Sequence, residues 1–242
     1  MFCLRSSPET AQLLVPADPL RSSENSVGAA FGKKMKAYKF RGVSQIPFAL
    51  DIVFNRRLFC ADWKSLNDPV EGTFIHRYES NANVPDRESV QQIILEKEKL
   101  KVCSLSSTFD SHLLWAHYAS GFSGLAIEVE LPDNSPTVKS VKYRGVFEQV
   151  TNEDHSSPPA TAGRILSSKY DAWKYEKEIR ILQRQEWFEL NCPVTRIICG
   201  HRMNKAMLKA LQIIAKSQKI PIHGLMVTED GLMPYDFSPH TK

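Results

Sequence analysis

The feature that most constrains the fold is a series of short segments in which apolar and polar residues alternate. Such alternation is typical of strands that turn one face to a core. We expect strands in eight segments: 35–43, 57–63, 101–108, 125–131, 139–147, the second half of 171–182, 194–200 and 224–230.

Four segments predict helices instead: 44–57, 86–100, 110–119 and 204–218. In the first, Ser44 suits the cap position and Pro47 the first turn. The second carries an apolar stripe of Val90, Ile93, Ile94 and Leu100. Residues 151–163 hold two prolines, a glycine and many polar groups, which favours a loop.

Strands outnumber helices and do not alternate with them, so the prediction is an α+β fold of mixed, strongly twisted sheets flanked by helices. The length of 242 residues suits one sizeable domain, placed at 36–242. Residues 1–35 are rich in Ser, Pro and Ala, and their only aromatic residues are Phe2 and Phe31. They predict a flexible tail.

Composition indicates in which compartment the protein is expected. No run of about 18 apolar residues is present, so no membrane span is expected. The five cysteines are scattered without a CxxC pair, which favours free thiols, a cytoplasmic protein and no metal site. A formal charge of +4 permits a polyanionic partner without requiring one. An exported effector with an unfolded leader in the tail is the alternative.

The segment 171–182 raises the question of chemistry. On a strand, Glu176 and Glu178 would lie about 6 to 7 Å apart on one face. Their repulsion would be about 2 to 3 kcal/mol at an effective dielectric near 20, which Arg180 or Lys174 can offset. A solvated charged strand face and a pair of carboxylates aimed at a substrate both remain open.

Three motifs occur in a set order: Arg41 on the first expected strand, Ser104 and Ser106 on one face of a later strand, and Glu176-x-Glu178 last. This order resembles the Arg, Ser-x-Ser, Glu-x-Glu signature of a class of mono-ADP-ribosyltransferases. The resemblance implies NAD as co-substrate, no metal, and an ADP-ribosyltransferase-like split sheet. The segment "SLSST" departs from a strict Ser-Thr-Ser.

The resemblance also implies roles for these residues. Arg41 would grip the pyrophosphate, and Ser104 or Ser106 would orient the ribose or a carboxylate. Glu178 would stabilise an oxocarbenium-like centre, and Glu176 would face the acceptor and help to deprotonate it.

A second resemblance covers residues 36 to about 235. The segments "YKFRGV", "SLNDPVEG", "LLWAHYASGFSGLAIEVEL" and "WKYEKEIRIL" are similar to motifs of the bacterial domain-of-unknown-function family 2971. That resemblance implies a single bacterial domain and names no reaction.

The segment 113–122 also bears on binding. His117 and Tyr118 are candidates to contact NAD, while Trp115 is expected in the core of a short helix. Asn67 and Asp68 are ordinary turn formers.

Three functions therefore stand side by side. The first is an NAD-consuming ADP-ribosyltransferase or NAD glycohydrolase, acting as a toxin, effector or defence component on a protein or nucleic acid. The second is a metal-independent nuclease or RNA-binding domain that uses Arg41, His117, Arg144 and Arg180. The third is a non-catalytic interaction module whose charged face keeps a sheet edge apart from other chains.

Overall fold

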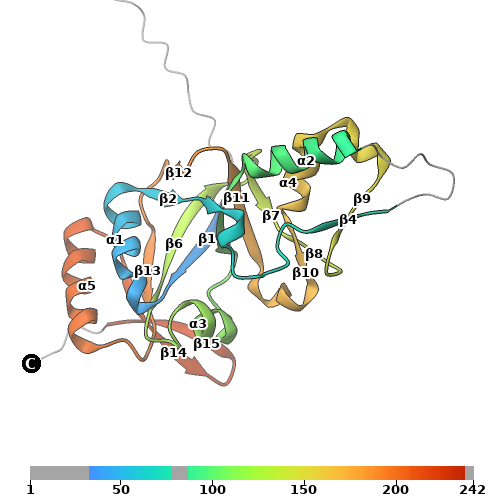
Figure 1. Cartoon of the computed structure of the whole chain (residues 1–242). Helices are drawn as coiled ribbons and strands as arrows, with labels where there is room; N and C mark the ends of the chain where they lie inside the picture. The colour runs from blue at the N-terminus through green and yellow to red at the C-terminus, as the bar shows by residue number, and fades with distance from the viewer. Residues whose placement is uncertain (1–32, 78–86, 238–242) are drawn as a thin grey trace, which may run out of the picture. The chain divides into compact units, whose positions relative to one another are not determined.

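The computed structural model describes residues 33–77 and 87–237, and Figure 1 traces their arrangement. The expected tail lies mostly outside these residues. From residue 32 onward the chain forms one unit. Its strands are β1 (Lys34–Arg41), β2 (Arg57–Phe59), β3 (Ala61–Asp62), β4 (Phe74–His76), β5 (Lys101–Ser106), β6 (Leu125–Pro132), β7 (Val138–Ser140), β8 (Lys142–Arg144), β9 (Glu148–Val150), β10 (Ser168–Tyr170), β11 (Glu178–Gln183), β12 (Trp187–Glu189), β13 (Arg196–Cys199), β14 (Ile222–Thr228) and β15 (Gly231–Asp236).

Helices flank these strands. They are α1 (Ile46–Asn55), α2 (Arg87–Glu98), α3 (His112–Tyr118), α4 (Pro158–Ile165) and α5 (Lys205–Gln218), with 3-10 turns η1 (Val43–Gln45), η2 (Trp63–Ser65), η3 (Asn152–Ser156) and η4 (Asp171–Glu176). None of the helices among the described residues has the length and apolar content that crossing a bilayer requires.

The main sheet has nine strands in the order β15-β14-β13-β6-β1-β5-β11-β7, with β3 paired to β5. Most pairs are antiparallel, but β13 and β14 are parallel and are joined by α5. This mixed, strongly curled sheet with flanking helices confirms the predicted α+β class.

The helices cover both faces of the sheet. The largest core cluster lies where α1 and α5 pack on alternate residues of the central strands, such as Ile127 and Ile197, and Figure 1 shows these two helices next to each other. The residues next to these in sequence, Ala126 and Ile198, belong to a second cluster with Trp115 of α3. Successive residues of these strands therefore point to opposite faces of the sheet, and both faces pack into a core.

The sheet opens between two of its central strands. β1 pairs with β6 at eight positions and β11 pairs with β5 at six, but β1 and β5 are paired only at Tyr38 and Ser106. Beyond this pair towards Arg41, the two strands are no longer joined by a ladder. Such an opening is compatible with the split sheet that the resemblance implies, which remains a prediction.

Several local expectations need correction. Gln45, not Ser44, is the N-cap residue of α1, and its side chain makes no capping hydrogen bond. Pro47 does lie in the first turn of the helix. Residues 151–163 are not a loop, because they contain η3 and most of α4. Pro158 and Pro159 are tolerated there since they begin the helix, where backbone donors have no intrahelical partner.

The edges of other elements also differ. The segment 57–63 forms two short strands that flank Cys60, and 139–147 forms parts of β7 and β8 rather than one strand. Of the apolar stripe predicted for the second helix, Ile93 is fully buried in α2. Leu100 lies beyond the end of that helix. Asp86, the first residue of the expected segment 86–100, is outside the described residues.

Candidate functional site

A cavity of about 220 Å³ lies where the sheet opens between β1 and β5. Six of the seven residues predicted from the sequence line it: Arg41, Ser104, Ser106, Tyr118, Glu176 and Glu178. The seventh, His117, is exposed and is not among the lining residues. Side chains from β1, β5, α3, η4 and β11 thus meet around one space although they are far apart in sequence.

Glu178 begins β11 and is held as a carboxylate. Nε and Nη2 of Arg180 donate to its Oε1 and Oε2 at 2.8 and 3.0 Å, and Nζ of Lys169 donates to Oε2 at 3.2 Å. Its backbone N–H donates to the hydroxyl of Tyr143. Burial alone would raise the pKa of Glu178, but the two cations outweigh burial and lower it to about 2.

Glu176 is placed differently from the prediction. It ends η4 rather than lying on a strand, and Lys177, with φ of 43°, turns the chain into β11. Its Oε1 accepts from the hydroxyl of Tyr118 at 2.5 Å and its Oε2 from Nζ of Lys169 at 2.6 Å. Since Glu176 and Glu178 are 4% and 5% exposed, the solvated-face interpretation is wrong.

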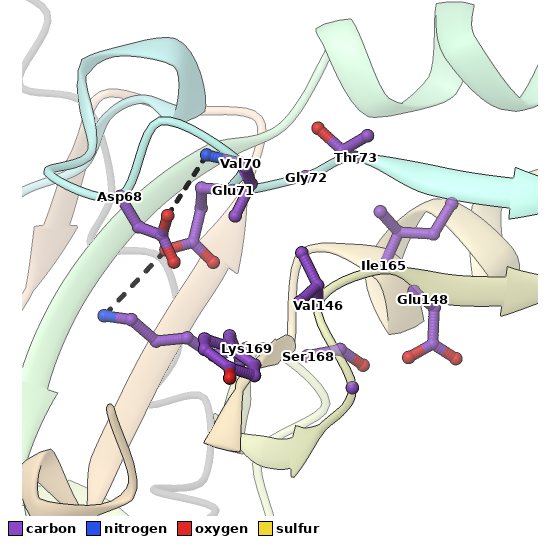
Figure 2. Close-up of a pocket in the computed structure, with 12 residues that line it drawn as sticks. Asp68, Val70, Glu71, Gly72, Thr73, Val146, Glu148, Ile165, Ser168 and Lys169 are labelled. Carbon is purple, nitrogen blue, oxygen red and sulfur yellow. Dashed lines mark hydrogen bonds and ion pairs between the residues drawn. The ribbon is translucent and has the colours of Figure 1, made fainter. Parts of the chain in front are cut away.

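The two carboxylates belong to a larger buried cluster. Nη1 of Arg180 lies 2.8 Å from Oε1 of Glu71 and donates to the carbonyl of Leu166 at 2.7 Å. Figure 2 shows Glu71 and Lys169 facing one another across a small polar cavity of about 10 Å³, which is room for about one water molecule. Burial raises the pKa of Glu71, against the effect of Arg180. Three carboxylates thus surround two cations.

Two cations of β1 also line the cavity. Lys39 donates to the carbonyl of Ser104 at 2.6 Å, and Arg41 has its Nε buried without a hydrogen-bond partner. Within the described residues neither has a carboxylate within 4.0 Å. Burial lowers the pKa of both groups. The Cys103 sulfur hydrogen-bonds Lys39 and interacts with Arg41, so the cavity is lined by two cations beside a cysteine and by the anchored carboxylates.

The two serines serve different purposes. The Ser106 hydroxyl donates to the backbone carbonyl of Glu176 at 2.6 Å and accepts from the N–H of Thr108, so it fixes the turn that carries Glu176. The Ser104 hydroxyl instead helps to lower the pKa of Glu178 through a hydrogen bond. Of the two, Ser104 fits the expected role of orienting a carboxylate.

Trp115 and Tyr118 of α3 lie in different surroundings. Trp115 is fully buried and donates its Nε1 to the carbonyl of Phe109 at 2.8 Å, which confirms its place in the core. Tyr118 turns towards the cavity, where its hydroxyl accepts from Nδ2 of Asn67 at 2.6 Å and donates to Glu176. Its position supports hydrogen bonding to Glu176, and contact of Tyr118 with NAD remains a prediction.

The lining residues that were not predicted include Lys39, Asn67 and Lys169. Lys39 precedes Arg41 by two positions on one strand, and this spacing was an available signal for a shared side. Asn67 was interpreted as a turn former only. Lys169 lies in a segment without periodicity, so no sequence pattern indicates it.

Metal ligands do not gather in this part of the chain. Across residues 33–77 and 87–237, no group of three or more His, Cys, Asp or Glu side chains is arranged to hold a metal ion. NAD, if bound, would be held by the residues of the cavity described above.

Comparison with known proteins does not assign the chain to a family. No protein-family model matches the chain, and neither a curated protein nor a solved structure matches it. The two family resemblances of the sequence thus stay predictions, and the function has to be argued from the cavity.

Proposed function

We propose that the protein cleaves the nicotinamide–ribose bond of NAD and transfers ADP-ribose to an acceptor or to water. The observation that carries this proposal is the charge pattern of the cavity. Lys39 and Arg41 line the cavity together with Glu176 and Glu178, and within the described residues neither cation has a carboxylate within 4.0 Å. NAD has a matching pattern, since its diphosphate is negative and its nicotinamide end is positive.

The size of the cavity supports a particular pose. Pockets for drug-sized ligands usually have about 300 to 1,000 Å³, and this one has about 220 Å³. It therefore suits the nicotinamide riboside half of NAD, with the diphosphate at Arg41 and the adenosine towards the mouth. The planar fork of Arg41 is suited to diphosphate oxygens.

The chemistry follows from the fixed carboxylates. As the C–N bond breaks, its electron pair leaves with nicotinamide and positive charge develops on the ribose ring. Glu178 cannot turn away from that charge, because Arg180 holds both of its oxygens. A preorganised carboxylate of this kind stabilises the transition state without reorganisation.

The acceptor then forms a bond to the ribose carbon, and its proton goes to Glu176. Both Glu176 oxygens already accept one hydrogen bond each. A carboxylate offers about four lone-pair sites, so each oxygen keeps one for the incoming proton. The acceptor itself is a protein side chain or a nucleic acid in this proposal, which would suit a toxin, effector or defence component.

The rival functions receive less support. Of the four residues invoked for a nuclease or RNA-binding site, only Arg41 lines the cavity; Arg144 pairs with Glu148, Arg180 is fully buried, and His117 is exposed. An interaction module that uses Glu176 and Glu178 as a solvated edge has no support either, because both are buried and β11 lies between β5 and β7.

The test is nicotinamide release from NAD by the wild type and by Glu178→Gln. We expect release by the wild type and a loss of at least about a hundredfold in the variant. Glu148→Gln is the matched control, because Glu148 is also a buried carboxylate between two arginines but does not line the larger cavity. Equal release by wild type and Glu178→Gln would remove Glu178 from the mechanism.

A further inference from the structure

Two cysteines face one another across neighbouring strands of the main sheet. β3 and β5 run antiparallel with Ala61 opposite Val102, and this register, continued by one residue, sets Cys60 opposite Cys103. Both cysteines are free, both belong to the largest core cluster, and their side chains hydrogen-bond one another. Residues opposite each other have Cβ atoms about 4.5 to 5.5 Å apart, and a disulfide spans about 3.5 to 4.5 Å. A small movement would therefore join the two sulfur atoms.

The surroundings of Cys103 favour its thiolate. The Cys60 thiol donates a hydrogen bond to the Cys103 sulfur, and Lys39 and Arg41 act on the same sulfur as cations. Together they hold the pKa of Cys103 below its usual range, although burial acts in the opposite direction. The hydrogen bond to Cys103 raises the pKa of Cys60, so Cys60 remains a thiol. A thiolate beside a thiol is the arrangement that oxidation to a disulfide requires.

The other cysteines of residues 33–77 and 87–237 provide a comparison. Cys199 is as buried as Cys103, but burial is what determines its pKa and raises it to about 12. Cys192 is half-buried and accepts a hydrogen bond from Nζ of Lys34 at 2.9 Å. A thiol that reacted because of exposure alone would thus be Cys192, and one that reacted because of its cations and its thiol partner would be Cys103.

The cavity between β1 and β5 gives small molecules a path towards Cys103. The Cys103 side chain is buried and does not line the cavity, but Lys39, which hydrogen-bonds its sulfur, and Ser104, which follows it on β5, both do. Hydrogen peroxide is close to water in size, so a movement of the Lys39 side chain admits it. Larger oxidants do not fit this path.

We propose that Cys103 is an oxidation site for hydrogen peroxide, that Cys60 is its resolving thiol, and that the product is a disulfide between β3 and β5. In the first step the Cys103 sulfur attacks one peroxide oxygen and the O–O bond breaks. The other oxygen leaves as hydroxide, which takes a proton from solvent and becomes water. In the second step the Cys60 sulfur displaces the hydroxyl group of the Cys103 sulfenic acid, and this hydroxyl leaves as water with the Cys60 proton.

The two cysteines together lose two electrons, and one peroxide is reduced to two water molecules. The disulfide removes the negative charge beside Lys39 and Arg41. It also restrains the segment after β3, which brings Ser65 and Asn67 to the cavity. The modification thus acts on the cavity of the proposed function, but its chemistry needs no NAD and does not depend on that function.

The experiment is a time course of hydrogen peroxide treatment of the full chain at neutral pH. The remaining thiols are alkylated in denaturant, and the peptides are identified by mass spectrometry. We expect a linked pair of peptides that contain Cys60 and Cys103, and we expect dithiothreitol to separate them. Cys199 should be oxidised at least about tenfold more slowly than Cys103, because it is buried without a cation that favours its thiolate.

Three variants test the assigned roles. In Cys60→Ser, oxidation of Cys103 should stop at the sulfenic acid, which dimedone traps, and no linked peptides should form. Lys39→Met should slow the oxidation of Cys103 at least about tenfold, because the thiolate loses a cation. Lys97→Met is the matched control with an unchanged rate, since Lys97 is a buried lysine outside the cavity.

Two results for the wild type would each overturn the inference: oxidation of Cys199 as fast as that of Cys103, or a disulfide that joins other cysteines instead. An unchanged rate of Cys103 oxidation in folded Lys39→Met would overturn it as well. Circular dichroism verifies the folding of each variant, and Lys39→Gln carries the same comparison if Lys39→Met does not fold. The wild-type measurement decides the inference even if neither variant folds.

Discussion

Arg180 holds Glu178 through two parallel hydrogen bonds of 2.8 and 3.0 Å between residues two apart on the same strand. The pair lies inside the protein, where Arg180 has no exposed surface. Removing one partner of such a buried pair leaves an uncompensated charge, which usually costs about 3 to 5 kcal/mol. The geometry therefore makes the Glu178 carboxylate both a structural element and a group of fixed orientation beside the cavity.

The first prediction concerns stability in acid. The folded-state pKa of Glu178, about 2, lies below its ordinary value of 4.5. Its contribution to the free energy of unfolding is therefore present above pH 4.5 and is lost as the pH falls from about 4.5 to 2. Urea denaturation across this range should show a shallower decline for Glu178→Gln than for the wild type.

The comparison with the variant is needed because protonation of Glu71 has the opposite effect on the free energy of unfolding. Burial raises the pKa of Glu71, so this residue is easier to protonate in the folded protein. Glu178 itself contributes to the raised pKa of Glu71, so the difference in stability between wild type and Glu178→Gln reports the combined effect of the pair. Parallel curves for the two proteins would show that Arg180 does not hold Glu178 in solution.

A second prediction addresses the hydroxyl of Tyr118. Tyr118→Phe leaves one oxygen of buried Glu176 and the Nδ2 of Asn67 without their partner. We expect a loss of about 1 to 3 kcal/mol in the free energy of unfolding, and slower ADP-ribose transfer at unchanged NAD affinity.

Tyr175→Phe is the control for that measurement, since it makes the same chemical change next to Glu176 without removing a hydrogen bond of Glu176. Equal transfer rates for the Tyr118 and Tyr175 variants would show that the Tyr118 hydroxyl does not position Glu176.

A third prediction concerns the turn that presents Glu71. Gly72 has φ of +69°, and a Cβ there would come within 2.8 Å of the Trp63 ring. Gly72→Ala should lower the free energy of unfolding by about 1 to 3 kcal/mol, and should weaken NAD binding because Glu71 contacts Arg180.

Gly145→Ala is its counterpart, because a Cβ at Gly145 meets nothing within 4 Å. Thermal denaturation should separate the two variants clearly. Similar melting temperatures would mean that the turn adapts and that its conformation is not required.

The sequence predicts the strands that carry Arg41, Ser104, Ser106 and Glu178, because each lies in an alternating segment. Which strands become neighbours is a long-range property. The pairs Tyr38 with Ser106 and Glu178 with Ser106 bring these residues together, and no local pattern indicates them. The order of the three motifs was the signal that anticipated their convergence.

Other parts of the site could not be predicted from local patterns. The placement of Glu176 depends on the left-handed conformation of Lys177, a residue for which that conformation is unusual. Lys169 reaches both glutamates from a three-residue strand that pairs with β8. Its role follows from tertiary packing alone.

The most direct test of the central claim is calorimetric titration of NAD into the wild type and into Arg41→Lys. Lysine keeps the charge but lacks the planar fork of donors. We predict saturable binding with one site per chain for the wild type, and at least about tenfold weaker binding for Arg41→Lys, with Arg184→Lys as an exposed control. Absence of saturable binding by the wild type, or equal affinity in the Arg41 variant, would contradict the account.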